Sequence, residues 1–210
     1  MSEGLFPSTR RSVLAAVQSG PSELRDSALA AIAEAYWKPA CKYIRLKWKA
    51  RPDDAEDLTQ SFFASLLERG LLARYDPARA SFRTYLRLCI DGHVSNIYRA
   101  GARRPLAPLE EDPPDPASME DVFYREWQRQ MFSLAVDDLK KLGQPVRFAI
   151  FEQYDLAAGE RPSYQDLATQ FELPVTSITN HLAWARRELR RCLLDRLESI
   201  GSSEAEMEST

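Results

Sequence analysis

The sequence predicts an all-α protein made of two small helical domains joined by a Pro-rich acidic linker. Apolar residues recur at three- and four-residue spacing along most of the chain, which is the spacing of amphipathic helices, and strand patterns are nearly absent. The composition changes at residues 105–118, PLAPLEEDPPDPAS, which hold five prolines and no aromatic residue. Such a segment cannot build a core, so we expect an extended tether between two separately folded units.

Helix signals can be followed through the first unit. Ser8 or Thr9 can cap a short helix that ends at Gly20, and a longer helix begins at Ser22. Pro39 lies within that longer pattern, and we expect it to kink or break the helix.

A third helix opens at Pro52-Asp53, buries a stripe on one face and stops near Gly70. The residues of that stripe are Leu58, Phe62, Phe63, Leu66 and Leu67. Ser81 or Thr84 begins the next helix, which carries the segment 82–104.

The second unit shows four helical segments. A long amphipathic helix covers 118–142 and is stopped by Gly143, another covers 146–157, and two more lie within 163–197. The expected organisation is a helical domain at 8–104, a linker at 105–118, a second helical domain at 119–197 and a disordered acidic tail at 198–210.

Charge is segregated along the chain although the net charge is only −3. Segment 82–104 carries five arginines against Asp91 alone, whereas 107–121 carries six carboxylates and no basic residue. Opposite charges in separate blocks indicate separate binding surfaces rather than one uniform field.

Several classes of protein are disfavoured. The three cysteines, Cys41, Cys89 and Cys192, are widely spaced and form no CxxC, which is typical of free thiols in a reducing compartment. No signal peptide and no apolar run of about 18 residues occurs, so we expect a soluble cytoplasmic protein with no membrane partner. His93 and His181 stand alone, and no Gly-rich phosphate loop occurs, so we predict no catalytic residue, no metal site and no cofactor.

Residues 163–191 show the pattern of a helix-turn-helix, a motif whose second helix enters the major groove of DNA. Ile178, Leu182 and Ala185 would bury the second helix. The alternative is a helical hairpin with a solvated Arg face. The positions expected to be exposed are Ser177, Thr179, Asn180, Ala183, Trp184, Arg186 and Arg187.

Segment 82–104 interleaves aromatic residues with its arginines, as proteins that hold unpaired bases do. The alternative is that Phe82, Tyr85 and Leu86 belong to the core and the arginines are ordinary surface residues.

Segment 53–63, DDAEDLTQSFF, places four carboxylates in the first turns of a helix. One or two acids there stabilise the helix dipole, and four are better explained by a partner that carries Arg or Lys.

Three segments, DAEDLTQSFF, FRTYLRLCIDGHVSNIYR and SYQDLATQFELPVTSITNHLAWARREL, together resemble a bacterial RNA polymerase sigma factor of the extracytoplasmic-function (ECF) type. The resemblance covers residues 25–104 and 120–197, with the motifs in the family's order. It implies a promoter-specificity subunit and not an enzyme, which binds core RNA polymerase and promoter DNA and helps to melt the duplex. An anti-sigma protein or other regulator is a further partner that the resemblance suggests.

The resemblance also implies roles for particular residues. The acidic helix would dock on the clamp helices of the polymerase β′ subunit through Asp54, Glu56, Asp57, Gln60 and Phe63. The basic helix would recognise and open the minus-10 element through Phe82, Arg83, Tyr85, Asn96, Arg99, Arg103 and Arg104. The helix-turn-helix would read the minus-35 element through Thr179, Asn180, His181, Trp184, Arg186 and Arg187.

The chain departs from the family pattern in its second domain. His181 and Trp184 stand where arginines are frequent, Glu172 replaces the turn glycine, and Pro174 replaces a capping serine. These departures indicate an unusual minus-35 preference.

Two rival functions remain open. A stand-alone helix-turn-helix regulator would bind duplex DNA tightly without polymerase, and a nuclease would use Asp53–Asp57 to hold a metal ion.

Overall fold

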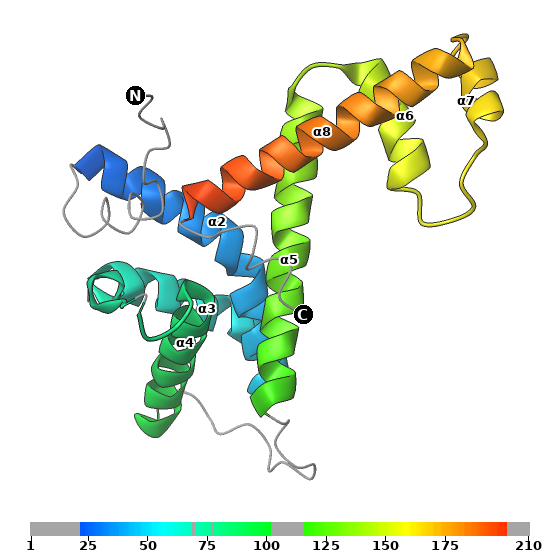
Figure 1. The fold of residues 1–210 in the computed structure, drawn as a ribbon. Coiled ribbons are helices and arrows are strands. Elements are labelled where there is room, and N and C mark those ends of the chain that lie inside the picture. The colour runs from blue at the N-terminus through cyan, green and yellow to red at the C-terminus, as the bar shows by residue number, and fades with distance from the viewer. Residues whose placement is uncertain (1–21, 69, 77, 102–115, 201–210) are drawn as a thin grey trace, which may run out of the picture. The chain divides into compact units, whose positions relative to one another are not determined.

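The computed structural model describes residues 22–68, 70–76, 78–101 and 116–200. Over these residues it contains seven α-helices, one 3₁₀-helix and no strand, which confirms the all-α class for this part of the chain (Figure 1). The predicted helix at 8–20, most of the predicted linker and the last ten residues lie outside the described residues.

The first unit is built on α2 (Ser22–Lys47), against which α3 (Pro52–Glu68) and α4 (Phe82–Arg99) pack. A short 3₁₀-helix, η2 (Leu71–Arg74), connects α3 to the loop before α4. Ile32, Tyr36, Tyr43 and Ile44 of α2 are at most 1 % exposed, because their separations are close to whole turns of a 3.6-residue helix and put them on one face.

Pro39 does not break α2. The helix continues from Ser22 to Lys47 with Pro39 inside it and buried, so of the two expected effects, a kink or a break, the break is wrong. Proline removes one backbone donor from a helix, a cost that tertiary packing can offset. The flanking Tyr36, Ala40 and Tyr43 are fully buried, and this packing holds the helix together on both sides of the proline.

Local signals fix the ends of the neighbouring helices as expected. Gly70 follows α3 with a φ of 58°, a left-handed conformation that glycine adopts without a steric cost. Ser81 is the N-cap of α4, where its side chain accepts a hydrogen bond from the Thr84 amide.

The boundary between the two compact units lies inside helices. Among the described residues, the first unit runs to Gln130 and includes Leu197–Ile200, and the second is Met131–Arg196. Helices α5 (Pro116–Lys141) and α8 (Val175–Ser199) therefore each contribute to both units. The sequence pattern predicted a boundary between the two domains at residues 105–118 instead.

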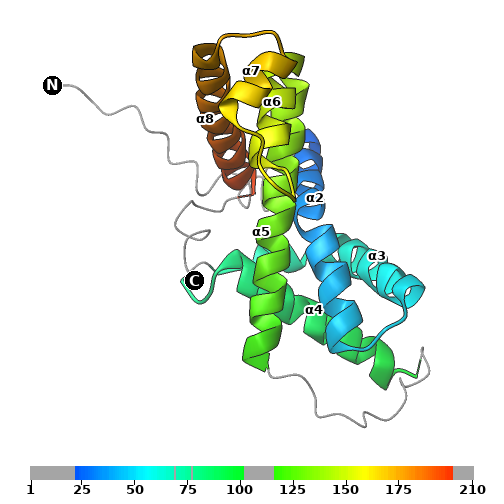
Figure 2. The same ribbon diagram turned by 90° about the vertical axis from the view of Figure 1, so that its right-hand side faces the viewer.

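The physical reason is aromatic packing by the first half of α5, which lies alongside α2 (Figure 2). Phe123 and Trp127 stack on Tyr36, with ring centroids 6.3 and 6.2 Å away, and both are at most 1 % exposed. Gln130 donates a hydrogen bond of 3.0 Å to the carbonyl of Glu34. Residues 119–130, which the sequence placed in the second domain, complete the core of the first unit.

The predicted linker ends earlier than expected, and the predicted tail begins later than expected. Pro116–Ser118 already belong to α5. Glu198 and Ser199 continue α8, and Ile200 is 1 % exposed.

The second unit joins the end of α5 to α6 (Pro145–Asp155), α7 (Tyr164–Gln170) and most of α8. Its core includes Leu139, Phe151, Leu167, Ile178 and Leu182, each at most 2 % exposed. Ser163 and Asp166 form a reciprocal capping box at the start of α7. None of the described helices is long and apolar enough to cross a bilayer.

Candidate functional site

The carboxylates of α3 lie on its solvent side. Glu56, Asp57 and Gln60 are exposed and Asp54 is half-buried, while Ala55, Leu58 and Phe62 face the core. The 3.6-residue period of the helix separates the two sets, so a partner can reach the acids without disturbing the core. We call Asp54, Glu56, Asp57 and Gln60 the acidic face.

Phe63 is not a surface residue, although it was predicted to bind a partner. It is 8 % exposed and stacks on Trp37 of α2, with 5.5 Å between ring centroids. Trp37 itself is 36 % exposed and offers the aromatic surface that Phe63 was expected to provide. The exposed ring of this stacked pair therefore lies on α2 and not on α3.

The first turn of α4 is committed to packing. Phe82 is 3 % exposed and meets Tyr36 and Tyr75 edge-on, at centroid distances of 5.6 and 5.2 Å. The Tyr85 hydroxyl donates a 2.6 Å hydrogen bond to the Leu71 carbonyl, and burial raises the pKa of Tyr85 to about 12. Both residues were predicted to contact the minus-10 element, and both hold α4 against its neighbours.

Arg83 is covered by α5. Its guanidinium lies 4.1 Å from the centroid of Tyr124 and 5.1 Å from that of Trp127, which are cation–π distances. By contrast, Asn96 and Arg99 near the end of α4 are exposed. Arg103 and Arg104 lie outside the described residues. The described part of the predicted minus-10 set is thus divided between a packed first turn and an exposed last turn.

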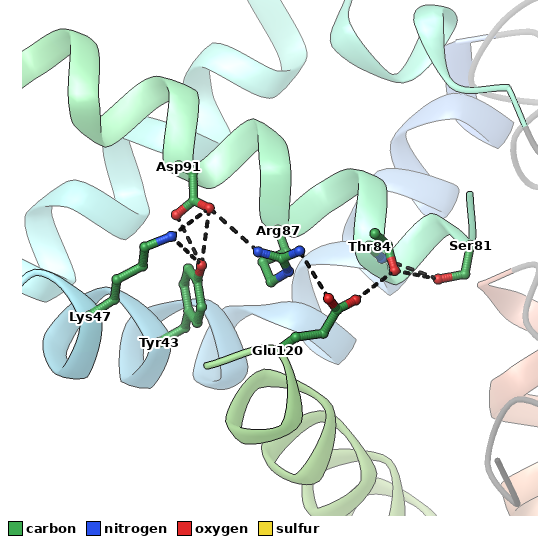
Figure 3. Close-up of polar contacts among 7 residues, drawn as sticks. All are labelled: Tyr43, Lys47, Ser81, Thr84, Arg87, Asp91 and Glu120. Carbon is green, nitrogen blue, oxygen red and sulfur yellow. Dashed lines mark hydrogen bonds and ion pairs between the residues drawn. The ribbon is translucent and has the colours of Figure 1, made fainter. Parts of the chain in front are cut away.

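A polar network ties α4 to α2 on one side (Figure 3). Asp91 accepts hydrogen bonds from Tyr43 Oη at 3.0 Å and from Lys47 Nζ at 2.7 Å. Burial raises the pKa of Tyr43, so its phenol remains a donor at neutral pH.

The same network reaches α5 on the other side (Figure 3). Glu120 accepts hydrogen bonds from Arg87 Nη2 and Thr84 Oγ1, both at 3.1 Å. The Arg87 side chain is only 11 % exposed and also lies 3.6 Å from Asp91. Arg87, one of the five arginines counted in the basic segment, therefore serves the packing of three helices.

In the second unit, α7 and α8 are joined by the short turn Phe171–Pro174. The amide of Glu172 donates to the Thr169 carbonyl and that of Leu173 to the Ala168 carbonyl, which is the Schellman arrangement. Glu172 adopts a φ of 53°, the left-handed conformation that usually selects glycine. Glu172 stands in place of the turn glycine of the family pattern, and it adopts the left-handed backbone conformation that a glycine would adopt there.

The predicted DNA-reading residues of α8 differ in their surroundings. Asn180 and Arg187 are exposed, and Thr179 is exposed with its hydroxyl bonded to the Thr176 carbonyl at 2.8 Å. Arg186 donates two hydrogen bonds of 2.9 Å to Asp155 of α6.

His181 and Trp184 are half-buried, and both lie near Arg147 of α6. The Arg147 guanidinium is 4.9 Å from the Trp184 centroid. Burial, and then the charge of Arg147, lower the pKa of His181, so its imidazole is neutral at pH 7.

No cluster of His, Cys, Asp or Glu with metal-binding geometry occurs among the described residues. His93 lies 3.1 Å from the Ser61 hydroxyl and packs edge-on against Phe62. It is therefore part of the α3–α4 contact.

Residues 35–104 match the family model Sigma-70 region 2. The match spans the part of α2 from Ala35, all of α3 and all of α4, so both the acidic face and the exposed end of α4 lie inside it. It supports a sigma factor, a non-enzymatic transcription initiation factor, and points to binding of RNA polymerase and recognition of the minus-10 promoter element. No curated protein and no solved structure matched the chain.

Proposed function

We propose that this chain is a sigma factor of the ECF type, which acts in the cytoplasm, binds core RNA polymerase and directs it to promoters with a minus-10 and a minus-35 element. The observation that carries the proposal is the match of residues 35–104 to sigma-70 region 2, with the acidic face exposed inside the matched segment.

The acidic face is the proposed contact with the clamp helices of the β′ subunit. Its members lie on the solvent side of a helix whose other side is buried, so a partner can reach them without disturbing the core. Carboxylates fixed in this way suit charge-assisted hydrogen bonds to arginine and lysine. The exposed ring of Trp37 extends the surface with an aromatic contact of the kind that anchors interfaces.

The proposed minus-10 contact is the exposed end of α4, with Asn96 and Arg99, continued by Arg103 and Arg104 outside the described residues. Phe82, Arg83 and Tyr85 support this helix from within the first unit. An amide and an arginine at a helix end can bind unpaired bases and backbone phosphates.

The proposed minus-35 contact is a helix-turn-helix formed by α7 and α8. Thr179, Asn180 and Arg187 offer polar groups on the outer side of α8, and His181 and Trp184 flank them. Arg186 holds α8 to α6 through Asp155 and is not counted among the base readers.

The proposal is tested by measuring the affinity of the full chain for core polymerase. We expect Asp57→Ala to weaken binding about tenfold, the effect of losing one charge-assisted hydrogen bond of roughly 1.4 kcal/mol. Asp121→Ala is the matched control, because Asp121 is an exposed carboxylate on α5 outside the acidic face. Equal core affinity of wild type and Asp57→Ala would remove the docking assignment.

The two rival functions give different results in the same preparation. A stand-alone regulator fails to bind core polymerase and binds duplex DNA tightly without it. A nuclease cleaves DNA when a divalent metal is added, and loses that cleavage in Asp57→Ala. A sigma factor binds core polymerase, cleaves no DNA, binds free duplex only weakly and at low salt, and supports run-off transcription only together with core polymerase.

A further inference from the structure

The basic side chains near the outer side of α8 are not equally available. The bidentate pairing of Arg186 with Asp155 occupies Nε and Nη2 and offsets the charge. Of the two arginines that the sequence assigned to this helix face, Arg187 is the one without such a carboxylate pairing among the described residues.

Arg147 supplies a second cation at the same place from a different helix. It is the third residue of α6, and its guanidinium lies over the ring of Trp184, 4.9 Å from the centroid. No hydrogen bond or ion pair holds its guanidinium within the described part of the chain, so its donors are not committed to a carboxylate.

The register of α8 places this cation beside the proposed reading positions. Asn180, Trp184 and Arg187 follow one another at four- and three-residue spacing, which puts them on one side of the helix. Arg147 also acts on His181, one turn before Trp184, whose pKa its charge lowers. Arg147 therefore borders the row that runs from Asn180 to Arg187.

The contact with Trp184 fits a phosphate ligand. An aromatic ring under a guanidinium restricts the side chain while leaving the N–H groups at its edge able to donate. Arginine presents these donors in a planar fork that matches the oxygens of a phosphate. A residue preorganised in this way loses less side-chain entropy on binding than a free surface arginine does.

We infer that Arg147 binds a backbone phosphate of duplex DNA next to the bases met by Asn180, and that Trp184 positions Arg147 instead of reading a base itself. This inference rests on the proposed DNA-binding role of α8. It adds a contact from α6, outside the turn and the two helices in which the sequence located DNA binding.

The test measures binding of the full chain to a fluorescein-labelled 30-base-pair duplex of mixed sequence, over a series of NaCl concentrations. Each phosphate contact contributes about 0.9 to the slope of log K against log salt concentration. We expect Arg147→Gln to lower affinity three- to tenfold and to reduce the slope by about one contact. Arg147→Lys keeps the charge and should keep the wild-type slope.

Lys140→Gln is the matched control. Lys140 is a cation of the same unit that also lies over an aromatic ring, 5.6 Å from the centroid of Phe148, a residue of α6 and not of the α8 row. Lys140→Gln changes the net charge by the same amount as Arg147→Gln. An equal reduction of the slope of log K against log salt concentration in the two variants would therefore overturn the inference. Trp184→Ala should weaken binding, and Trp184→Phe should retain most of it.

The inference and the proposed function can fail separately. If Asn180→Ala weakens duplex binding while Arg147→Gln leaves both affinity and slope unchanged, the DNA role of α8 stands and the role of Arg147 is wrong. If the wild-type chain shows no duplex binding even at the lowest salt, both are wrong. If Arg147→Lys reduces the salt dependence of binding as much as Arg147→Gln does, the effect is structural and the assignment of a phosphate contact to Arg147 is wrong.

Discussion

Charged residues of this chain fall into two groups according to what they meet in the fold. Arg87, Arg186 and Arg196 are held by carboxylates on other helices, namely Glu120, Asp155 and Asp138. Arg99 and Arg187 are exposed instead. Because all arginines carry the same charge in the sequence, only the surroundings of each one separate a structural role from a binding role.

The pair between Asp138 and Arg196 gives a prediction at the residue scale. Arg196 donates to Asp138 from Nε at 2.5 Å and from Nη2 at 2.8 Å, and these hydrogen bonds hold the pKa of Asp138 below its usual value. A lowered folded-state pKa stabilises the fold above the unfolded value of about 4, and this contribution is lost as the pH falls through the folded-state pKa. We expect Asp138→Asn to lower the free energy of unfolding by about 1 kcal/mol or less at pH 7.

Urea unfolding of the full chain at pH 7 and at pH 2 checks this prediction. The difference between wild type and Asp138→Asn should be smaller at pH 2, because protonation of the carboxyl group increases as the pH falls toward the folded-state pKa. Asp137→Asn is the control, because the neighbouring Asp137 is exposed. A difference that stays constant with pH would contradict the assigned role of the carboxylate charge.

At the scale of the elements, the turn between α7 and α8 depends on a residue in an unfavourable conformation. Glu172 holds a φ of 53°, which costs a residue with a Cβ atom about 1 kcal/mol. The turn persists because the amides of Glu172 and Leu173 satisfy carbonyls at the end of α7, and because Leu173 packs against the core of the second unit.

We expect Glu172→Gly to raise the free energy of unfolding of the second unit by up to about 1 kcal/mol, because glycine adopts this φ without a steric cost. Thermal or urea unfolding followed by circular dichroism measures the change. Glu152→Gly is the matched control: Glu152 is exposed in the middle of α6, and glycine there should destabilise by about 1 kcal/mol. Equal destabilisation by both substitutions would show that the turn carries no strain.

At the scale of the whole molecule, the units do not end where the sequence motifs end. The segment that matches sigma-70 region 2 stops at residue 104, yet the core of the first unit needs Phe123 and Trp127 from α5. Glu120 adds polar contacts to Thr84 and Arg87. Both ends of the segment between α4 and α5 are therefore joined to the first unit.

This organisation predicts that a chain ending at residue 104 is less stable than one ending at residue 130. Removal of residues 105–130 exposes the ring of Tyr36 that Phe123 and Trp127 cover, and loss of a single buried aromatic side chain costs about 3–5 kcal/mol. We expect the shorter chain to melt at least 10 °C lower, since about 1 kcal/mol shifts the midpoint of a small domain by roughly 4–8 °C. Equal melting temperatures would show that α5 is dispensable for the first unit.

Much of the local structure could be predicted from the sequence. The all-α class, the stops at Gly70 and Gly143 and the caps at Ser81 and Ser163 depend on residues that are neighbours in the chain. The same holds for the acidic face, because a helical period alone decides that Glu56 and Asp57 point away from Leu58 and Phe62.

Tertiary structure decided which side chains remain available for binding. Phe63, Phe82 and Arg83 looked like contact residues, and they became packing residues because α2 and α5 cover them. Pro39 was tolerated for the same reason, since helices from elsewhere in the chain bury the residues around it. The sequence by itself determined the helices and the segregation of charge, which depend on near neighbours. Only the packing of distant helices decided which charges and rings are exposed, because burial depends on contacts between residues far apart in the chain.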